Sequence, residues 1–81
     1  MNEEEILTEL KKVLFEDFEV EADVITKEAS FYDDLGLDSL DAIDLIVTMN
    51  NIFDIDVDNK EIENTKTIQQ LIDVVQTNLA K

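Results

Sequence analysis

The 81-residue chain contains no cysteine and no histidine. Without cysteine there are no disulfide bonds and no thiolate nucleophile, and without either residue type a zinc site of the usual ligands cannot form. No imidazole is present to activate a serine in the manner of a hydrolase. This limited chemical equipment argues against an enzyme. The absence of cysteine also fits a cytoplasmic location.

Positive charge is scarce as well: 6 basic residues, all lysines, stand against 21 acidic ones, and the net charge is −15 at pH 7. Such a chain is repelled by nucleic acid and by anionic membranes, so we expect protein partners with Lys and Arg patches. Hydrophobic residues make up 44% of the sequence and recur regularly, which argues against disorder. No apolar run could span a bilayer, and the acidic, polar first residues predict no signal peptide.

Proline is absent, which is consistent with helices, but this absence does not show where the helices begin and end. Apolar residues recur at helical spacing over residues 3–17, 38–53 and 68–79, and each stretch is long enough for a helix. A short helical turn is predicted over 59–64. The sequence therefore predicts an all-α fold, a small four-helix bundle with three main helices and one short helix, in a single domain covering residues 1–81.

Two of the main helices have capping signatures at their starts. Asn2 and Glu5 have the spacing of a capping box before the first helix, and Thr67 and Gln70 have it before the last. The long segment 19–37 shows no sustained period. We expect it to cross from one end of the bundle to the other, held by its scattered apolar side chains: Val20, Val24, Ile25, Ala29, Phe31 and Leu35.

The helix over residues 38–53 carries apolar side chains on two nearly opposite sides. The larger side continues to the helix end and predicts the core face: Ala42, Leu45, Ile46, Met49 and Phe53. The other is a strip of Leu40, Ile43 and Val47, flanked by Asp41 and Asp44. Since a peripheral helix buries one broad face, we interpret this strip as an exposed docking surface. The alternative is that the strip packs under the long loop.

The start of the same helix is the most informative part of the sequence. Gly36, the only glycine, permits a sharp turn, and Asp38 is a good N-cap residue. Asp41 falls in the first turn, where the helix dipole favours negative charge. Ser39 would then be the first helical residue, with its hydroxyl pointing outward. A serine in this setting is most often only a cap; if Ser39 has special chemistry, it is a substrate for another enzyme.

Residues 34–41, Asp-Leu-Gly-Leu-Asp-Ser-Leu-Asp, resemble the attachment motif of acyl carrier proteins. The similarity extends over nearly the whole chain, through Phe53-Asp54 and Val57 to Thr67, Ile68 and Ile72. The resemblance implies that Ser39 carries a 4′-phosphopantetheine arm, added from coenzyme A by a Mg²⁺-dependent phosphopantetheinyl transferase (a holo-acyl-carrier-protein synthase). Acyl groups would be bound to the thiol of the arm as thioesters.

The resemblance also implies partners and their contacts. By position, the acidic contacts of the family to basic patches are matched by Asp38, Asp41 and Asp44. Its apolar contacts are matched by Leu40, Ile43 and Val47. The partners would be separate acyl-loading and acyl-processing enzymes of fatty-acid biosynthesis or of related lipid or polyketide pathways, served by a monomer. Acyl chains in this family shelter between the helices, which would involve Met49, Phe53, Ile62 and Leu71, although each is equally explained as core.

The sequence departs from the family pattern at two places. Carriers of fatty-acid synthesis are strongly acidic late in this helix, where the present chain has Asn50-Asn51-Ile52, and a proline common in the family is replaced by Asp58. The first change removes negative charge from part of the docking surface. We therefore hypothesise a specialised carrier, or a second copy of a carrier, with its own set of partners.

Two other functions remain open from the residues alone. Asp54, Asp56 and Asp58 match the first ligand positions of an EF-hand loop, but Asn59 and Thr65 stand where Gly and Glu are required. These mismatches argue against a true EF-hand and favour loose binding of divalent cations by the acidic surface, which would relieve its self-repulsion. The second alternative is an unmodified acidic helical adaptor that docks basic partners, for which Ser39→Ala would be silent.

Overall fold

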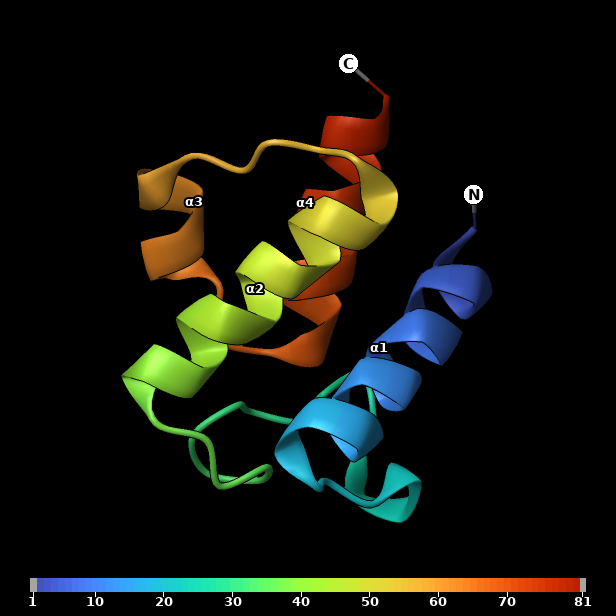
Figure 1. Cartoon of the computed structure of the whole chain (residues 1–81), viewed down its shortest axis with the longest axis vertical. Helices are drawn as coiled ribbons and strands as arrows, with labels where there is room; N and C mark the ends of the chain where they lie inside the picture. The colour runs from blue at the N-terminus through green and yellow to red at the C-terminus, as the bar shows by residue number, and fades with distance from the viewer. Residues whose placement is uncertain (1, 81) are drawn as a thin grey trace.

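Helices account for most of the architecture (Figure 1). The computed structural model describes residues 2–80, and within them it contains α1 (Glu3–Phe18), the 3-10 helix η1 (Ala22–Val24), α2 (Ser39–Phe53), α3 (Asn59–Asn64) and α4 (Ile68–Leu79). The predicted all-α bundle is confirmed, and each of its four helices lies within one residue of the predicted bounds. The short helix η1 was not predicted.

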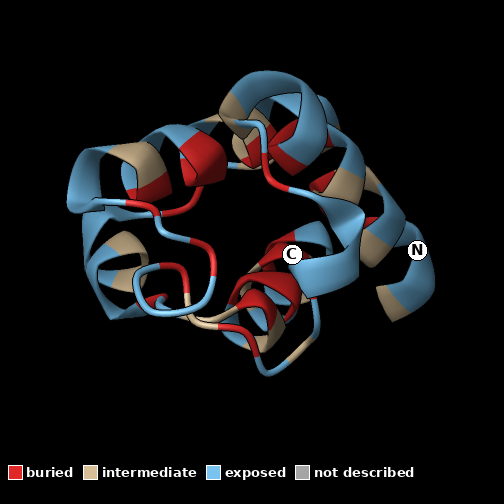
Figure 2. Cartoon of the chain, turned by 90° about the horizontal axis from the view of Figure 1, so that it is seen from below, coloured by how far each residue is buried: buried red, intermediate tan, exposed pale blue. Residues whose placement is uncertain are grey.

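The core lies between α1, α2 and α4, each of which contacts the other two. Their apolar stripes point inward, as the buried positions in Figure 2 show. The residues that are almost fully buried come from all three helices and from the loop: Ile6, Leu10, Leu14, Phe31, Leu45, Ile46, Met49, Ile68, Leu71, Ile72 and Val75. Burial of such side chains contributes roughly 1.5–3 kcal/mol each, so this shared core stabilises the bundle more than any surface contact does.

The predicted capping boxes are present at α1 and α4. The Glu5 N–H donates to Asn2 Oδ1 at 2.9 Å, and the Asn2 N–H donates to Glu5 Oε1 at 3.4 Å. At α4 the Gln70 N–H donates to Thr67 Oγ1 and the Thr67 N–H to Gln70 Oε1, both at 3.2 Å. These bonds satisfy backbone donors that a helix start leaves without partners.

The long connection between α1 and α2 is held by side chains and by backbone pairing. Its apolar residues are buried as expected, with the exception of Val24, which is 48% exposed. Val24 ends the surface turn η1, and the next residue, Ile25, takes the buried position. The loop also forms an isolated β-bridge, Ser30 with Thr67, and the Phe31 N–H donates to the Lys66 carbonyl at 3.0 Å. The loop is thereby fixed against the start of α4.

Helix α3 is attached less firmly than the other helices. None of its residues is fully buried, and Ile62 is half-buried against the core. The Asn78 Nδ2 of α4 donates to Glu61 Oε2 at 3.2 Å, and the buried Thr65 donates to the Glu61 carbonyl at 2.6 Å. Within residues 2–80, no helix has both the length and the apolar character that crossing a membrane requires.

Candidate cofactor-attachment site

The turn before α2 is built around Gly36, whose φ is +69°. This left-handed conformation is strained for a residue with a side chain, which explains a glycine here. On one side of the turn the Ser30 carbonyl accepts from the Asp34 and Leu35 N–H groups, both at 3.1 Å, and on the other the Leu37 N–H donates to the Phe31 carbonyl at 2.9 Å. The backbone is therefore fixed just before the helix begins.

Helix α2 begins with a capping box of two carboxylates. The Asp41 N–H donates to Asp38 Oδ1, and the Asp38 N–H donates to Asp41 Oδ2. Asp38 is thus the N-cap residue and Ser39 the first residue of α2, as the sequence predicts. Both carboxylates lie near the positive end of the helix dipole, which favours them there. The local sequence alone therefore fixes where the Ser39 hydroxyl stands.

The Ser39 side chain is exposed. The structure gives its hydroxyl no hydrogen-bond partner within residues 2–80, whereas the Thr48 hydroxyl on the same helix donates to the Asp44 carbonyl at 2.8 Å. Since Asp38 supplies the cap, Ser39 is not needed for that purpose. An exposed serine hydroxyl of this kind fits a covalent attachment to phosphate made by a second protein, because the chain has no imidazole to deprotonate it.

The predicted strip on α2 lies at the surface. Leu40 is 71% exposed, Ile43 43% and Val47 44%. Asp38 and Asp44 are exposed and Asp41 is partly exposed beside them. The alternative that the long loop covers this strip is therefore wrong. The loop is instead tied to the start of α4 by its backbone.

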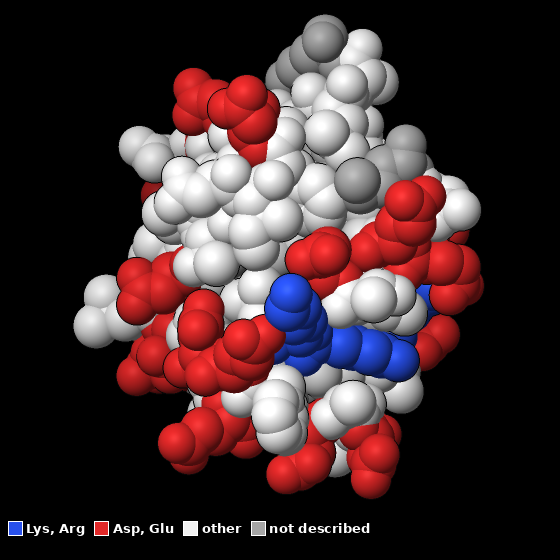
Figure 3. Space-filling view, turned by 45° about the vertical axis from the view of Figure 1, so that its right-hand side comes forward, with Lys and Arg blue, Asp and Glu red and all other residues white. Residues whose placement is uncertain are grey.

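The surface as a whole is strongly acidic, as Figure 3 shows for one face, where carboxylates surround a few lysine side chains. The second half of α2 is different, because no carboxylate occurs between Asp44 and Asp54. Asn51 and Ile52 are exposed, but Asn50 is partly buried, and its buried Oδ1 has no hydrogen-bond partner among residues 2–80. The uncharged part of the surface therefore depends on Asn51 and Ile52 more than on Asn50.

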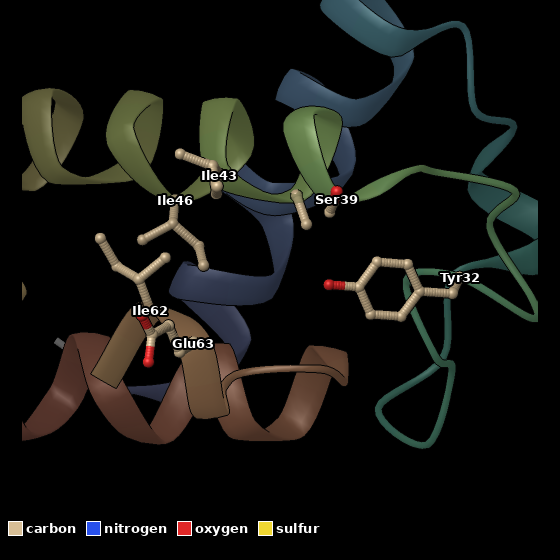
Figure 4. A pocket seen from close by; sticks show the side chains of 7 residues that line it. Tyr32, Ser39, Ile43, Ile46, Ile62 and Glu63 are labelled. Carbon is tan, nitrogen blue, oxygen red and sulfur yellow. The ribbon is translucent and has the colours of Figure 1, made fainter. Parts of the chain in front are cut away.

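A pocket of about 230 Å³ opens beside Ser39, between α2 and α3. Ile43 and Ile46 line it from α2, Ile62 and Glu63 from α3, and Tyr32 faces them from the loop (Figure 4). Its remaining lining residues are Ser39 itself and Ala42. The serine hydroxyl and a mostly apolar pocket are thus direct neighbours.

Of the four residues that the resemblance implied for an acyl-chain pocket, only Ile62 lines this one. Met49 and Leu71 are fully buried in the packed core, and Phe53 packs against that core. Sequence reasoning missed Tyr32, Ile46 and Glu63. The spacing of residues 39, 42, 43 and 46 places them on one face of a helix, so the sequence could have indicated the α2 side of the pocket. The α3 side depends on how that helix packs, which the sequence does not show.

The acidic residues of the suspected cation loop have other roles in the structure. Asp54 ends α2 in a left-handed conformation, and Asp58 caps α3 by accepting from the Glu61 N–H at 2.8 Å. Across residues 2–80, no cluster of three potential metal-ligating side chains is found. The EF-hand alternative thus gains no support from the geometry.

Comparison with known proteins defines the class to which the chain belongs. Residues 8–75 match the family described as "Phosphopantetheine attachment site", so the cofactor of this class is 4′-phosphopantetheine. The acyl carrier protein of Buchnera aphidicola (subsp. Acyrthosiphon pisum, strain 5A) is 42% identical over 89% of this chain and 91% of its own length. That of Thermosynechococcus vestitus is 34% identical over 99% of both chains.

The fold leads to the same group of proteins. The crystal structure of the acyl carrier protein from Thermotoga maritima matches with a TM-score of 0.89, at 25% identity, over 99% of this chain and 93% of the other. The chain belongs to the acyl carrier protein family. The resemblance first noted in residues 34–41 is therefore confirmed over most of the sequence.

Proposed function

We propose that Ser39 is the residue to which the phosphopantetheine arm is attached. The observation that carries this proposal is the exposed hydroxyl at the first position of α2, beside an apolar pocket. In the attachment step the Ser39 oxygen forms a bond to the phosphorus of coenzyme A nearest the pantetheine. The bond from that phosphorus to 3′,5′-ADP breaks, 3′,5′-ADP leaves, and a base of the transferase takes the serine proton. When attached, the arm supplies the thiol that carries an acyl group as a thioester.

In this role the protein is a carrier and a substrate of other enzymes, not a catalyst. Its own residues hold the attachment point in place: Gly36 sets the turn, and the Asp38–Asp41 capping box fixes the helix start. The arm therefore leaves the surface from a rigid position, which suits repeated delivery to separate enzymes. Family membership supports a phosphopantetheinyl transferase and acyl-processing enzymes as partners. We further propose that the protein works as a monomer in the cytoplasm, in fatty-acid or related biosynthesis.

The surface of α2 around Ser39 is the proposed docking face for these enzymes. Lys and Arg side chains of the partner would form ion pairs with Asp38, Asp41 and Asp44. Apolar side chains of the partner would pack against Leu40, Ile43 and Val47. Opposite charges raise the association rate and select the partner, whereas the buried apolar contacts slow dissociation. A high negative charge of −15 supports this arrangement, since it favours partners with basic patches.

The uncharged C-terminal end of α2 supports the proposal that this protein is a specialised carrier, which binds its own partner enzymes and not the usual ones of fatty-acid synthesis. Asn51 and the 44%-exposed Ile52 offer a basic partner nothing to pair with at this end of the helix. A partner adapted to this chain would therefore have its cations near Asp38, Asp41 and Asp44 only. The test compares binding to a housekeeping ketosynthase of fatty-acid synthesis for the wild type and for Asn51→Glu combined with Ile52→Glu. Tighter binding of the variant is expected, and equally tight binding of the wild type would contradict the specialisation.

The attachment itself is tested by intact mass after incubation with coenzyme A, Mg²⁺ and a phosphopantetheinyl transferase. The wild type is expected to gain the mass of one phosphopantetheinyl group, and Ser39→Ala to gain nothing. Ser30→Ala is the matched control, because Ser30 is the other serine of the chain, and it should be modified like the wild type. If the folded wild type stays unmodified while a known carrier is modified in the same tube, the unmodified adaptor becomes the better explanation.

A further inference from the structure

The outward side of α1 carries an exposed aromatic ring that the core does not use. Phe15 is 54% exposed, and among the large apolar side chains of residues 2–80 only Leu40 is more exposed. At about 100° per residue, Phe15 points to the side of α1 nearly opposite the buried stripe. That stripe consists of Ile6, Leu10, Val13 and Leu14. Neither core packing nor helix propensity explains Phe15, because phenylalanine is a weaker helix former than alanine, lysine or glutamate.

Two lysines border this ring. Lys12 and Lys11 precede Phe15 by three and four positions, so the three side chains are neighbours on the helix surface. They are the only adjacent lysines in a chain with 21 acidic residues, and Figure 3 shows lysine side chains in the middle of an acidic face. The one ion pair found within residues 2–80 nevertheless joins Lys27 to Glu3. A single exposed apolar side chain is ordinary, but one beside two cations without ion pairs points to a contact outside the chain.

We propose that Lys11, Lys12 and Phe15 form a second docking surface, the α1 face, which binds a protein partner at an apolar pocket rimmed by Asp or Glu side chains. The Phe15 ring would fill the pocket, and the lysines would form ion pairs with the carboxylates at its rim. An aromatic side chain buried in a pocket contributes a large share of the binding free energy at many interfaces. The charges of the α1 face select a locally acidic partner surface, whereas the docking face on α2 selects a basic one.

The occupant is a protein surface and not an extended polyanion. Nucleic acids and anionic membranes present negative charge over a wide area, which the net charge of −15 repels. A protein can place a few carboxylates beside the lysines and neutral or basic residues around them. Glu16 and Glu19 follow Phe15 in the sequence, so the acidic rim of the partner belongs on the N-terminal side of the ring.

The α1 face is separate from the docking face on α2. Helices α1, α2 and α4 contact one another around one core, so the outward sides of α1 and α2 point in different directions (Figure 1). A protein bound to the α1 face would leave the outward side of α2 and Ser39 accessible. Such a partner would hold the carrier in place while other enzymes bind to α2 in turn. This inference does not depend on the attachment of the arm to Ser39.

The experiment introduces a benzophenone-bearing phenylalanine analogue at position 15 and irradiates cells that produce the protein. The same analogue at Thr77, an exposed position of α4, is the matched control. Mass spectrometry then identifies the crosslinked peptide. Position 15, but not position 77, should give a crosslink to one protein, at a peptide that combines apolar and acidic residues. Ser39→Ala and Leu40→Ala should leave the yield of this crosslink unchanged, because neither residue belongs to the α1 face.

Binding of the identified protein to the purified carrier then tests the three residues. Phe15→Ala should weaken binding by about tenfold, as the loss of a central aromatic side chain does at other interfaces. Lys11→Glu with Lys12→Glu should also weaken it, and replacing the acidic rim of the partner by lysine should restore binding of this variant. Lys60→Glu with Lys66→Glu changes the net charge equally outside the α1 face, and this control should bind nearly as well as the wild type.

Three results would overturn the inference. The first is the absence of a specific protein crosslink from position 15, or a crosslink to lipid or nucleic acid in its place. The second is a crosslinked peptide rich in Lys and Arg, which would assign Phe15 to the edge of the docking face on α2. The third is equal weakening by the two double lysine variants, which would show that only net charge matters. All three leave the role of Ser39 untouched, because its modification is measured separately by intact mass.

Discussion

The Asp41 N–H donates a hydrogen bond to Asp38 Oδ1 at 2.9 Å, and the Asp38 N–H reaches back to Asp41 Oδ2 at 3.4 Å. These two carboxylates close the first turn of α2 around Ser39, which stands between them in the sequence. The same two residues also belong to the acidic part of the proposed docking face. Their structural and recognition roles therefore overlap, and a suitable pair of substitutions can separate them.

Asp38→Ala should lower the free energy of unfolding by about 1 kcal/mol, because it removes an N-cap side chain. Asp38→Asn keeps a capping oxygen and should cost only a few tenths of a kcal/mol, although it removes the charge. Urea unfolding measures both changes. If Asp38 also pairs with a basic partner, Asp38→Asn should raise the KM of the transferase while stability stays close to that of the wild type. Equal destabilisation by both variants would contradict the capping role.

Gly36→Ala should destabilise the fold by about 1–2 kcal/mol through backbone strain alone. The φ of Gly36 is +69°, and within residues 2–80 a Cβ at this position would meet no atom within 4 Å apart from those of its two chain neighbours, so no clash with the rest of the fold adds to the cost. Gly36→Asn is the matched comparison, because asparagine tolerates the left-handed region better, and it should cost clearly less. The measurement is again urea unfolding. A larger loss for Asn than for Ala would show that strain is not the cause.

The features that sequence reasoning predicted correctly are those fixed by neighbours in the chain. The capping boxes of α1 and α4, the sharp turn at Gly36 and the outward position of Leu40 depend on residues a few positions apart. The bridge between Ser30 and Thr67 joins residues far apart in the sequence, and its hydrogen bonds use backbone atoms that every sequence has. No side-chain pattern could have indicated it.

The pocket shows the same limit of sequence reasoning. Its α2 side follows from helical spacing, but Ile62 and Tyr32 reach it only because α3 and the loop pack where they do. Met49 and Leu71 were predicted to line the pocket, because the sequence pattern does not distinguish an apolar residue that lines a pocket from one that is packed in the core. The structure assigns them to the core instead, where they are fully buried.

Leu40→Ala should leave stability within about 0.5 kcal/mol of the wild type, because this side chain is 71% exposed. It should nevertheless raise the KM of the phosphopantetheinyl transferase by about fivefold, which corresponds to about 1 kcal/mol of lost apolar contact. Val24→Ala is the control, since Val24 is an exposed apolar residue of η1 away from the docking helix in sequence. An equal increase of KM in both variants would show that the effect is general and would remove Leu40 from the docking face.

Asp44→Asn should weaken the dependence of transferase binding on salt. The Asp44 side chain is exposed on α2, and its backbone carbonyl accepts from the Thr48 hydroxyl regardless of the side chain, so the fold should be unchanged. Salt screens an exposed ion pair, so the wild-type KM should rise between low and physiological ionic strength. The rise should be smaller in the variant, whereas the control Asp73→Asn on α4 should behave like the wild type. Identical salt curves for all three proteins would contradict a role of Asp44 in docking.

Glu61→Ala should loosen α3 without disturbing the rest of the bundle. The side chain of Glu61 accepts from Asn78 Nδ2 at 3.2 Å and joins α3 to α4, while its backbone bonds to Asp58 and Thr65 survive the substitution. Losing one such bond costs about 1 kcal/mol, so amide hydrogen exchange at Ile62 and Thr65 should accelerate about fivefold relative to the wild type. Exchange in the middle of α4 should change little. Glu63→Ala removes the same charge from the same helix without removing the bond to Asn78, and it should leave these rates unchanged; equal acceleration in both variants would mean that Glu61 does not hold α3.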